Sequence, residues 1–89
     1  MINSFVFERG AEGGLPEDVA RDLDDNYDEG KNQLVSNVRF EVAEGSIKFS
    51  YDHRLSGIDH NLERNVIESA LEKGYSIDNL SIRRTNNKS

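Results

Sequence analysis

The sequence contains no cysteine, no tryptophan and a single proline among its 89 residues. The absence of cysteine excludes disulfides, thiolate zinc ligands and a thiol nucleophile. No apolar run approaches the roughly 18 residues of a membrane span, and the first residues lack the basic and apolar segments of a signal peptide. We therefore expect a small cytoplasmic domain that depends on a single hydrophobic core for its stability.

Positive charge is also scarce, because 17 acidic residues outnumber 11 basic ones and give a net charge of -6. The whole excess lies in residues 1–30, where nine acids accompany only two arginines. The rest of the chain contains nine basic and eight acidic residues and is nearly neutral. This distribution disfavours generic binding to nucleic acid or to an anionic membrane, and it favours a cationic partner.

Residues 35–51 alternate between apolar and polar side chains, which predicts a central β-hairpin that turns at Glu44-Gly45. The alternation fixes the register, because a slip of one residue would move every apolar side chain to the opposite face. The predicted pairs are Val42 with Ile47, Phe40 with Phe49 and Val38 with Tyr51 on the apolar face, and Glu41 with Lys48 and Arg39 with Ser50 on the other.

Two amphipathic helices and two further strands complete the predicted domain. The expected elements are a strand at 2–7 with Phe5 and Phe7 on one face, a helix at 16–28, a helix at 59–73 capped by Asp59 or Ser56 and closed by Gly74, and a last strand to about Thr85 in which Leu80 and Ile82 alternate with Ser81 and Arg83. The order β-α-β-β-α-β predicts an α+β two-layer sandwich, most simply the ferredoxin-like split βαβ. We expect one domain over residues 1–85 and a disordered polar tail at 86–89.

A glycine-rich segment at 10–14 lies between the first strand and the first helix, which is where phosphate-binding loops occur. Its spacing matches neither the dinucleotide-binding nor the P-loop motif. Glu17 and Asp18 also occupy the helix N-terminus that a phosphate would need. We therefore expect a flexible connection, whose mobility would let it adapt to a partner.

Metal and catalytic motifs are incomplete. Asp24, Asn26 and Asp28 match the first ligands of a calcium loop, but the glycine comes one residue late and Val35 stands where the bidentate glutamate belongs. His53 and His60 each follow an aspartate, yet two histidines without a third nitrogen or sulfur ligand make a poor zinc site, so a surface loop and a helix start are expected there. No nucleophile lies beside a base, and we predict neither enzymatic activity, nor a cofactor, nor a dedicated metal site.

The acidic first third favours a non-enzymatic protein-interaction module, acting as an inhibitor, adaptor or regulator. It would dock its first helix on a basic surface of a partner protein, in the extreme case as a nucleic-acid mimic whose carboxylates replace phosphates. The expected partner-binding residues are Asp22, Asp24, Asp25, Tyr27, Asp28 and Glu29. A plainly solubilising acidic face is the competing interpretation.

A second hypothesis is a nucleic-acid-binding module that uses the open face of the sheet and the basic last strand. Its expected phosphate ligands are Arg39, Lys48, Arg83 and Arg84. RNA-binding modules of this topology stack bases on exposed aromatic residues, whereas the hairpin aromatics of this chain are needed for the core. We expect a monomer or a weak homodimer that associates through the second sheet face or an edge strand.

Overall fold

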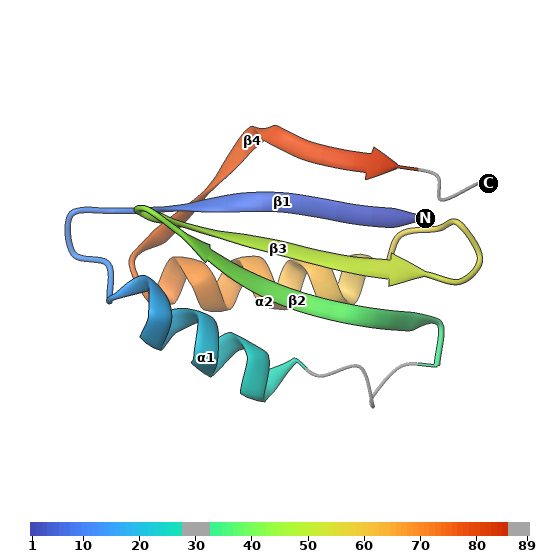
Figure 1. Ribbon diagram of the computed structural model, residues 1–89, viewed down its shortest axis with the longest axis horizontal. Helices are drawn as coiled ribbons and strands as arrows, with labels where there is room; N and C mark the ends of the chain where they lie inside the picture. Colours follow the sequence, from blue (N-terminus) through green and yellow to red (C-terminus); the bar gives the residue numbers. More distant parts are fainter. Residues whose placement is uncertain (28–32, 86–89) are drawn as a thin grey trace.

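The central hairpin forms with the predicted register. In the computed structural model, which describes residues 1–27 and 33–85, β2 (Val35–Ala43) pairs antiparallel with β3 (Ser46–His53) (Figure 1). The confirmed pairs are Phe40 with Phe49, Val42 with Ile47, Glu41 with Lys48 and Arg39 with Ser50. The chain reverses at Gly45, whose φ of 70° lies in the left-handed region that glycine tolerates best.

The remaining predicted pair, Val38 with Tyr51, is absent because the register shifts between Ser36 and Arg39. Asn37 has a φ of 53°, so the strand bulges there. Val38 still packs, partly buried, against the core. The alternation of side chains therefore survives, although the simple ladder does not.

The sheet has four antiparallel strands in the order β2-β3-β1-β4, with β1 (Ile2–Arg9) between β3 and β4 (Tyr75–Thr85). The helices α1 (Pro16–Asn26) and α2 (His60–Glu72) cover one face of it, and no described element covers the other, open face (Figure 1). This is the predicted α+β sandwich with the split βαβ arrangement. The last strand completes the sheet.

The core lies between the sheet and the helices. Phe49 is at its centre with a side chain that is 0% exposed. Its ring centroid lies 5.1 Å from that of Phe5, 5.0 Å from that of Phe40 and 5.5 Å from that of Tyr51. The other buried apolar residues are Phe7, Val19, Ala20, Leu23, Val35, Ile47, Val66, Ala70 and Tyr75.

The expected alternation of Leu80 with Ile82 in the last strand is wrong. A register shift interrupts the pairing of β1 with β4, and Leu80 projects from it with 87% of its surface exposed. The Asp78 side chain accepts a hydrogen bond from the Leu80 amide at 3.0 Å, and the Ser81 hydroxyl accepts one from the Val6 amide at 2.7 Å. Local side-chain hydrogen bonds thus stabilise a bulge that apolar periodicity does not reveal.

The helix ends agree with their sequence signals where the structure describes them. The Asp59 side chain caps α2 by accepting from the Leu62 amide at 3.0 Å, and Gly74 follows the helix with a φ of 84°. The helix α1 ends at Asn26 with Tyr27 as its C-cap, which is shorter than the predicted helix at 16–28. The expected tail at 86–89 lies outside the described residues. In the described part of the chain, no helix has the length and apolarity to cross a membrane.

The glycine-rich segment is a packed connection, which corrects the expectation of a flexible one. The Gly10 amide donates to the Gly74 carbonyl at 2.8 Å, and the Gly14 amide donates to the Lys73 carbonyl at 3.2 Å. A Cβ on Gly74 would lie 2.6 Å from the Gly13 Cα atom, which is a steric clash. Because the Gly13 Cα atom belongs to the main chain, no side-chain movement could remove this clash. The glycines therefore allow two main-chain segments to touch where α1 begins and α2 ends.

We expect Gly74→Ala to lower the free energy of unfolding by roughly 2 to 3 kcal/mol, through its positive φ and the backbone clash together. Gly45→Ala is the matched control, since Gly45 also has a positive φ but nothing lies within 4 Å of the position that a Cβ would take there. That change should cost only about 1 kcal/mol. Urea denaturation measures both, and equal losses would contradict the packing role of Gly74.

Candidate functional site

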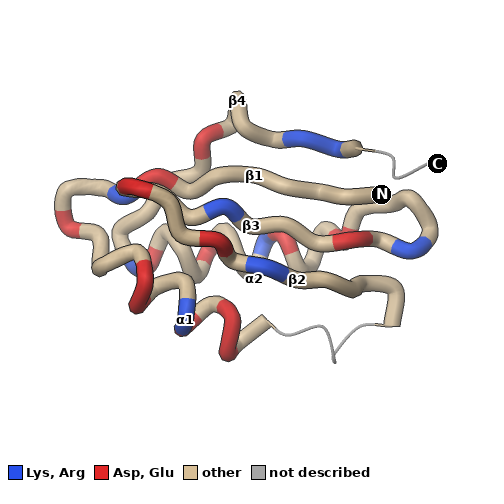
Figure 2. The backbone as a smooth tube through the Cα atoms, viewed as in Figure 1, with Lys and Arg blue, Asp and Glu red and all other residues tan. Residues whose placement is uncertain are grey.

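The predicted partner-binding acids within α1 are exposed. Figure 2 shows the acidic positions along this helix. Val19, Ala20 and Leu23 form the buried side of the helix, and Asp22, Asp24 and Asp25 are exposed. With Glu17 and Asp18, the helix presents five carboxylates and one arginine. Two of the predicted residues, Asp28 and Glu29, lie outside the described part of the chain.

This acidic surface is only weakly neutralised. Among the described residues, Arg21 approaches Asp18 to 3.9 Å and Lys73 approaches Asp22 to 3.8 Å. Such exposed pairs contribute from nothing to about 1 kcal/mol each. The last turn of α1 contains no basic residue, so the helix dipole disfavours Asp24 and Asp25.

Tyr27, a predicted partner-binding residue beside these acids, makes its polar contacts with α2. Its hydroxyl donates to the Asn65 carbonyl at 3.1 Å and lies 2.6 Å from the Ser69 hydroxyl, both on α2. The side chain is partly buried against the core. Tyr27 therefore holds the end of α1 against α2.

The four residues of the nucleic-acid hypothesis are not brought together. Arg39 and Lys48 lie on the open face of the sheet, where Glu41 sits directly opposite Lys48. The Arg83 guanidinium donates to the carbonyl groups of Leu80 at 2.9 Å and Ile82 at 3.1 Å, and so folds back on its own strand.

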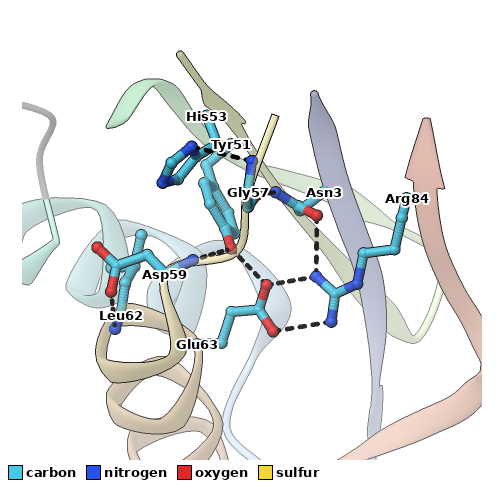
Figure 3. Close-up of polar contacts among 8 residues, drawn as sticks. All are labelled: Asn3, Tyr51, His53, Gly57, Asp59, Leu62, Glu63 and Arg84. Carbon is cyan, nitrogen blue, oxygen red and sulfur yellow. Dashed lines mark hydrogen bonds and ion pairs between the residues drawn. The ribbon is translucent and has the colours of Figure 1, made fainter. Parts of the chain in front are cut away.

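Arg84 points to the helix-covered side of the sheet, where it forms a two-pronged ion pair with Glu63 of α2 (Figure 3). One nitrogen contacts the Glu63 Oε2 atom and also donates to Asn3 at 3.0 Å, and the other donates to Oε1 at 3.0 Å. The paired carboxylate raises the pKa of Arg84. This guanidinium is already committed within the fold.

Glu63 joins Arg84 to a polar network that links three strands to the start of α2 (Figure 3). The Tyr51 hydroxyl donates to Glu63 and accepts from the Asp59 amide at 3.0 Å. Asn3 is 0% exposed and donates to the Gly57 carbonyl at 3.1 Å. Among the described residues, no buried side-chain polar atom lacks a hydrogen-bond partner. The complete satisfaction of these groups identifies the network as a structural clamp.

Burial, followed by the hydrogen bond to Glu63, raises the pKa of Tyr51 above its ordinary value of about 10. Its phenol therefore contributes stability that is fully present below about pH 10 and is lost as the pH rises toward the raised pKa of the folded state. We therefore expect the free energy of unfolding to fall as the pH rises above about 10, by at most about 1.4 kcal/mol per pH unit for this group.

Urea denaturation at several alkaline pH values measures this loss. Tyr75 adds to the effect, since burial raises its pKa too. Tyr51→Phe removes one titrating group and should flatten the dependence relative to the wild type. An unchanged slope in that variant would contradict the assignment to Tyr51.

The sequence carries signals for this network that hydrophobic periodicity alone does not count. Asn3 has the same parity as Phe5 and Phe7, which places it on the core face of β1. Glu63 lies three residues before Val66 and therefore on the apolar stripe of α2. A polar residue at a core position of each element could have indicated the network.

His53 is buried at the end of β3, which corrects the expected surface loop. Its Nδ1 atom accepts from the amides of Leu55 at 3.2 Å and Gly57 at 3.1 Å, and so shapes the turn into α2. His60 is exposed at the first position of α2, as expected. Among the described residues, no group of three or more His, Cys, Asp or Glu side chains is arranged to hold a metal ion.

Open depressions on the described part of the surface include two that have charged side chains in their lining. One of about 270 Å³ lies on the open sheet face, with Arg39, Glu41 and Asp52 among its lining residues. The other, of about 360 Å³, lies near the start of α2 beside His53 and His60. Both mix charged and apolar side chains, unlike the enclosed and mainly apolar pockets that bind small ligands.

No family model, curated protein or solved structure matches the chain.

Proposed function

We propose that this protein is an interaction module that docks the acidic outer surface of α1 on a basic surface of another protein, as an inhibitor, adaptor or regulator. The observation that supports this most is the placement of Asp24 and Asp25 in the last turn of α1, exposed and without a basic residue in that turn. These charges lower the stability of the helix. Residues that destabilise an element locally, with no stabilising contact to offset the loss, are typical of functional surfaces.

The alternative, nucleic-acid binding through the open sheet face, has weaker support. Arg83 and Arg84 are occupied by contacts within the fold, which leaves Arg39 and Lys48. These two share the face with Glu41 and Asp52. Two cations among acids provide little of the counterion release that drives binding to phosphates.

The test compares two variants of equal net charge. The first carries Asp22→Asn, Asp24→Asn and Asp25→Asn, and the second carries Glu44→Gln, Glu68→Gln and Glu72→Gln, which replace exposed acids outside α1. Each protein is immobilised, and binding partners are captured from a lysate at low and at high salt. The proposal predicts a salt-sensitive partner that the wild type and the second variant retain and the first loses.

Equal loss in both variants would show that only the overall charge matters, and the acidic surface would then be solubilising. Capture of no salt-sensitive partner would also overturn the proposal. If nucleic acid displaces the partner from the wild type, the docking takes the form of nucleic-acid mimicry.

A further inference from the structure

The strand β2 lies at the edge of the sheet and has β3 as its only neighbour among the described strands (Figure 1). Between Val38 and Ala43, no main-chain group of a described residue outside β3 hydrogen-bonds to the main chain of β2. Alternate amide and carbonyl groups therefore face away from the sheet. An edge of this kind is a ready template for one more strand.

The core is also incomplete beneath this edge. On β3, the inward-facing side chains of Ile47 and Phe49 are fully buried. On β2, Phe40 is only partly buried and Val42 is 44% exposed, although both face the same side of the sheet. An added strand would cover this apolar surface.

The helix α1 packs beside β2, so its acidic residues lie near the free edge of the sheet (Figures 1 and 2). Asp22 pairs with Lys73 at the end of α2, so it lies on the flank of α1 that faces α2. Glu17 and Asp24 lie roughly 200° around the helix from Asp22 at 3.6 residues per turn. They therefore flank the free edge of β2.

A second copy of the chain is disfavoured as the occupant of this edge. A two-fold axis through Phe40 would place Arg39 opposite Glu41 of the second copy, which is favourable. The same axis would bring two α1 helices together on one side of the joined sheet. Each contributes five carboxylates, so the pairing would be opposed by repulsion between like charges.

We propose that the free edge of β2 binds an extended basic segment of the partner protein as a fifth strand. Its main chain would pair with residues 38–43, and alternate lysine or arginine side chains would lie over Phe40 and Val42 with their charged ends at Glu17 and Asp24. This inference rests on the proposed function and specifies the chemistry and conformation of the partner.

The test is a titration with an alternating threonine–lysine peptide of about eight residues, a typical strand length. Amide chemical shifts of the ¹⁵N-labelled full chain are followed by NMR. We expect the largest changes at residues 38–43 and weaker binding as the salt concentration rises. The role of the acids is tested with the double variant Glu17→Gln and Asp24→Asn, which should bind the peptide at least about tenfold more weakly than the wild type. The control of equal net charge is the double variant Glu68→Gln and Glu72→Gln, which should bind the peptide as well as the wild type does.

Strand pairing is tested with two peptides that are N-methylated at alternate residues in opposite phases. In one phase the methyl groups replace the amide protons that face β2, which should weaken binding by at least about tenfold, and in the other phase they face solvent. Equal affinities of the two peptides would overturn strand addition and leave acidic docking intact. Absence of binding at low salt would overturn the extended basic segment, whereas the proposed function is overturned only when no salt-sensitive partner is captured from the lysate.

Concentration-dependent shifts at residues 38–43 in the absence of peptide would instead identify a second copy as the occupant. That result would overturn the proposal that a basic segment of a partner protein occupies the edge of β2.

Discussion

Replacement of Phe49 by alanine is expected to lower the free energy of unfolding by about 3 to 5 kcal/mol. The ring is fully buried and contacts Phe5, Phe40 and Tyr51, so its removal leaves a cavity that three other rings line. A domain of this length has a total stability of roughly 4 to 13 kcal/mol. The change should therefore remove a large part of the stability, as measured by urea denaturation and circular dichroism.

Phe40→Ala is the matched control for Phe49→Ala. Phe40 stacks on the same ring at 5.0 Å, but it lies on the edge strand and is only partly buried. Its truncation should cost less than half as much, because water already reaches part of the ring. A loss at Phe40 equal to that at Phe49 would mean that the edge of the sheet is buried in solution.

The sequence predicted the elements whose apolar period is unbroken. The hairpin register followed from the alternation around Phe40 and Phe49. The helix α2 followed from its apolar stripe, from Asp59 as its cap and from Gly74 just past its end. These signals are local, and each one agrees with the final packing.

The features that were missed depend on contacts between distant segments. Leu80 has the correct parity for a core residue, but the bulge of β4 is fixed by hydrogen bonds of Asp78 and Ser81. In the sequence, Gly13 and Gly74 indicate two unrelated interruptions of secondary structure, and only the fold brings their main chains together. Hydrophobic periodicity carries no information about such pairings.

The candidate site was predictable to the same extent. The exposure of Asp22, Asp24 and Asp25 followed from the helical pattern of α1. The roles of Tyr27 and Arg84 did not, because each is decided by a partner on α2 far along the chain. The predictions of Tyr27 as a partner-binding residue and of Arg84 as a phosphate ligand therefore fall on side chains that the fold uses for contacts with α2.

Loss of the ion pair between Glu63 and Arg84 is expected to lower the free energy of unfolding by the largest amount after Phe49→Ala. Glu63→Leu leaves the Arg84 guanidinium without its carboxylate and the Tyr51 hydroxyl without its acceptor. Removal of one partner from a buried pair typically costs 3 to 5 kcal/mol, and partial access of Arg84 to water places this case at the lower end, about 3 kcal/mol. Urea denaturation near neutral pH measures the loss.

A double-mutant cycle separates the pair from its surroundings. Arg84→Met alone strands the Glu63 carboxylate, which is buried beneath β1 and β4, and should cost about 2 to 3 kcal/mol. The combined variant removes both charges and places apolar side chains between the sheet and α2, so it should be little less stable than either single variant. The resulting coupling energy should be about 2 kcal/mol, because residues in one hydrogen-bonded network are not independent. Losses that simply add would show that Glu63 and Arg84 act separately, and the clamp would then depend on Tyr51 and Asn3 alone.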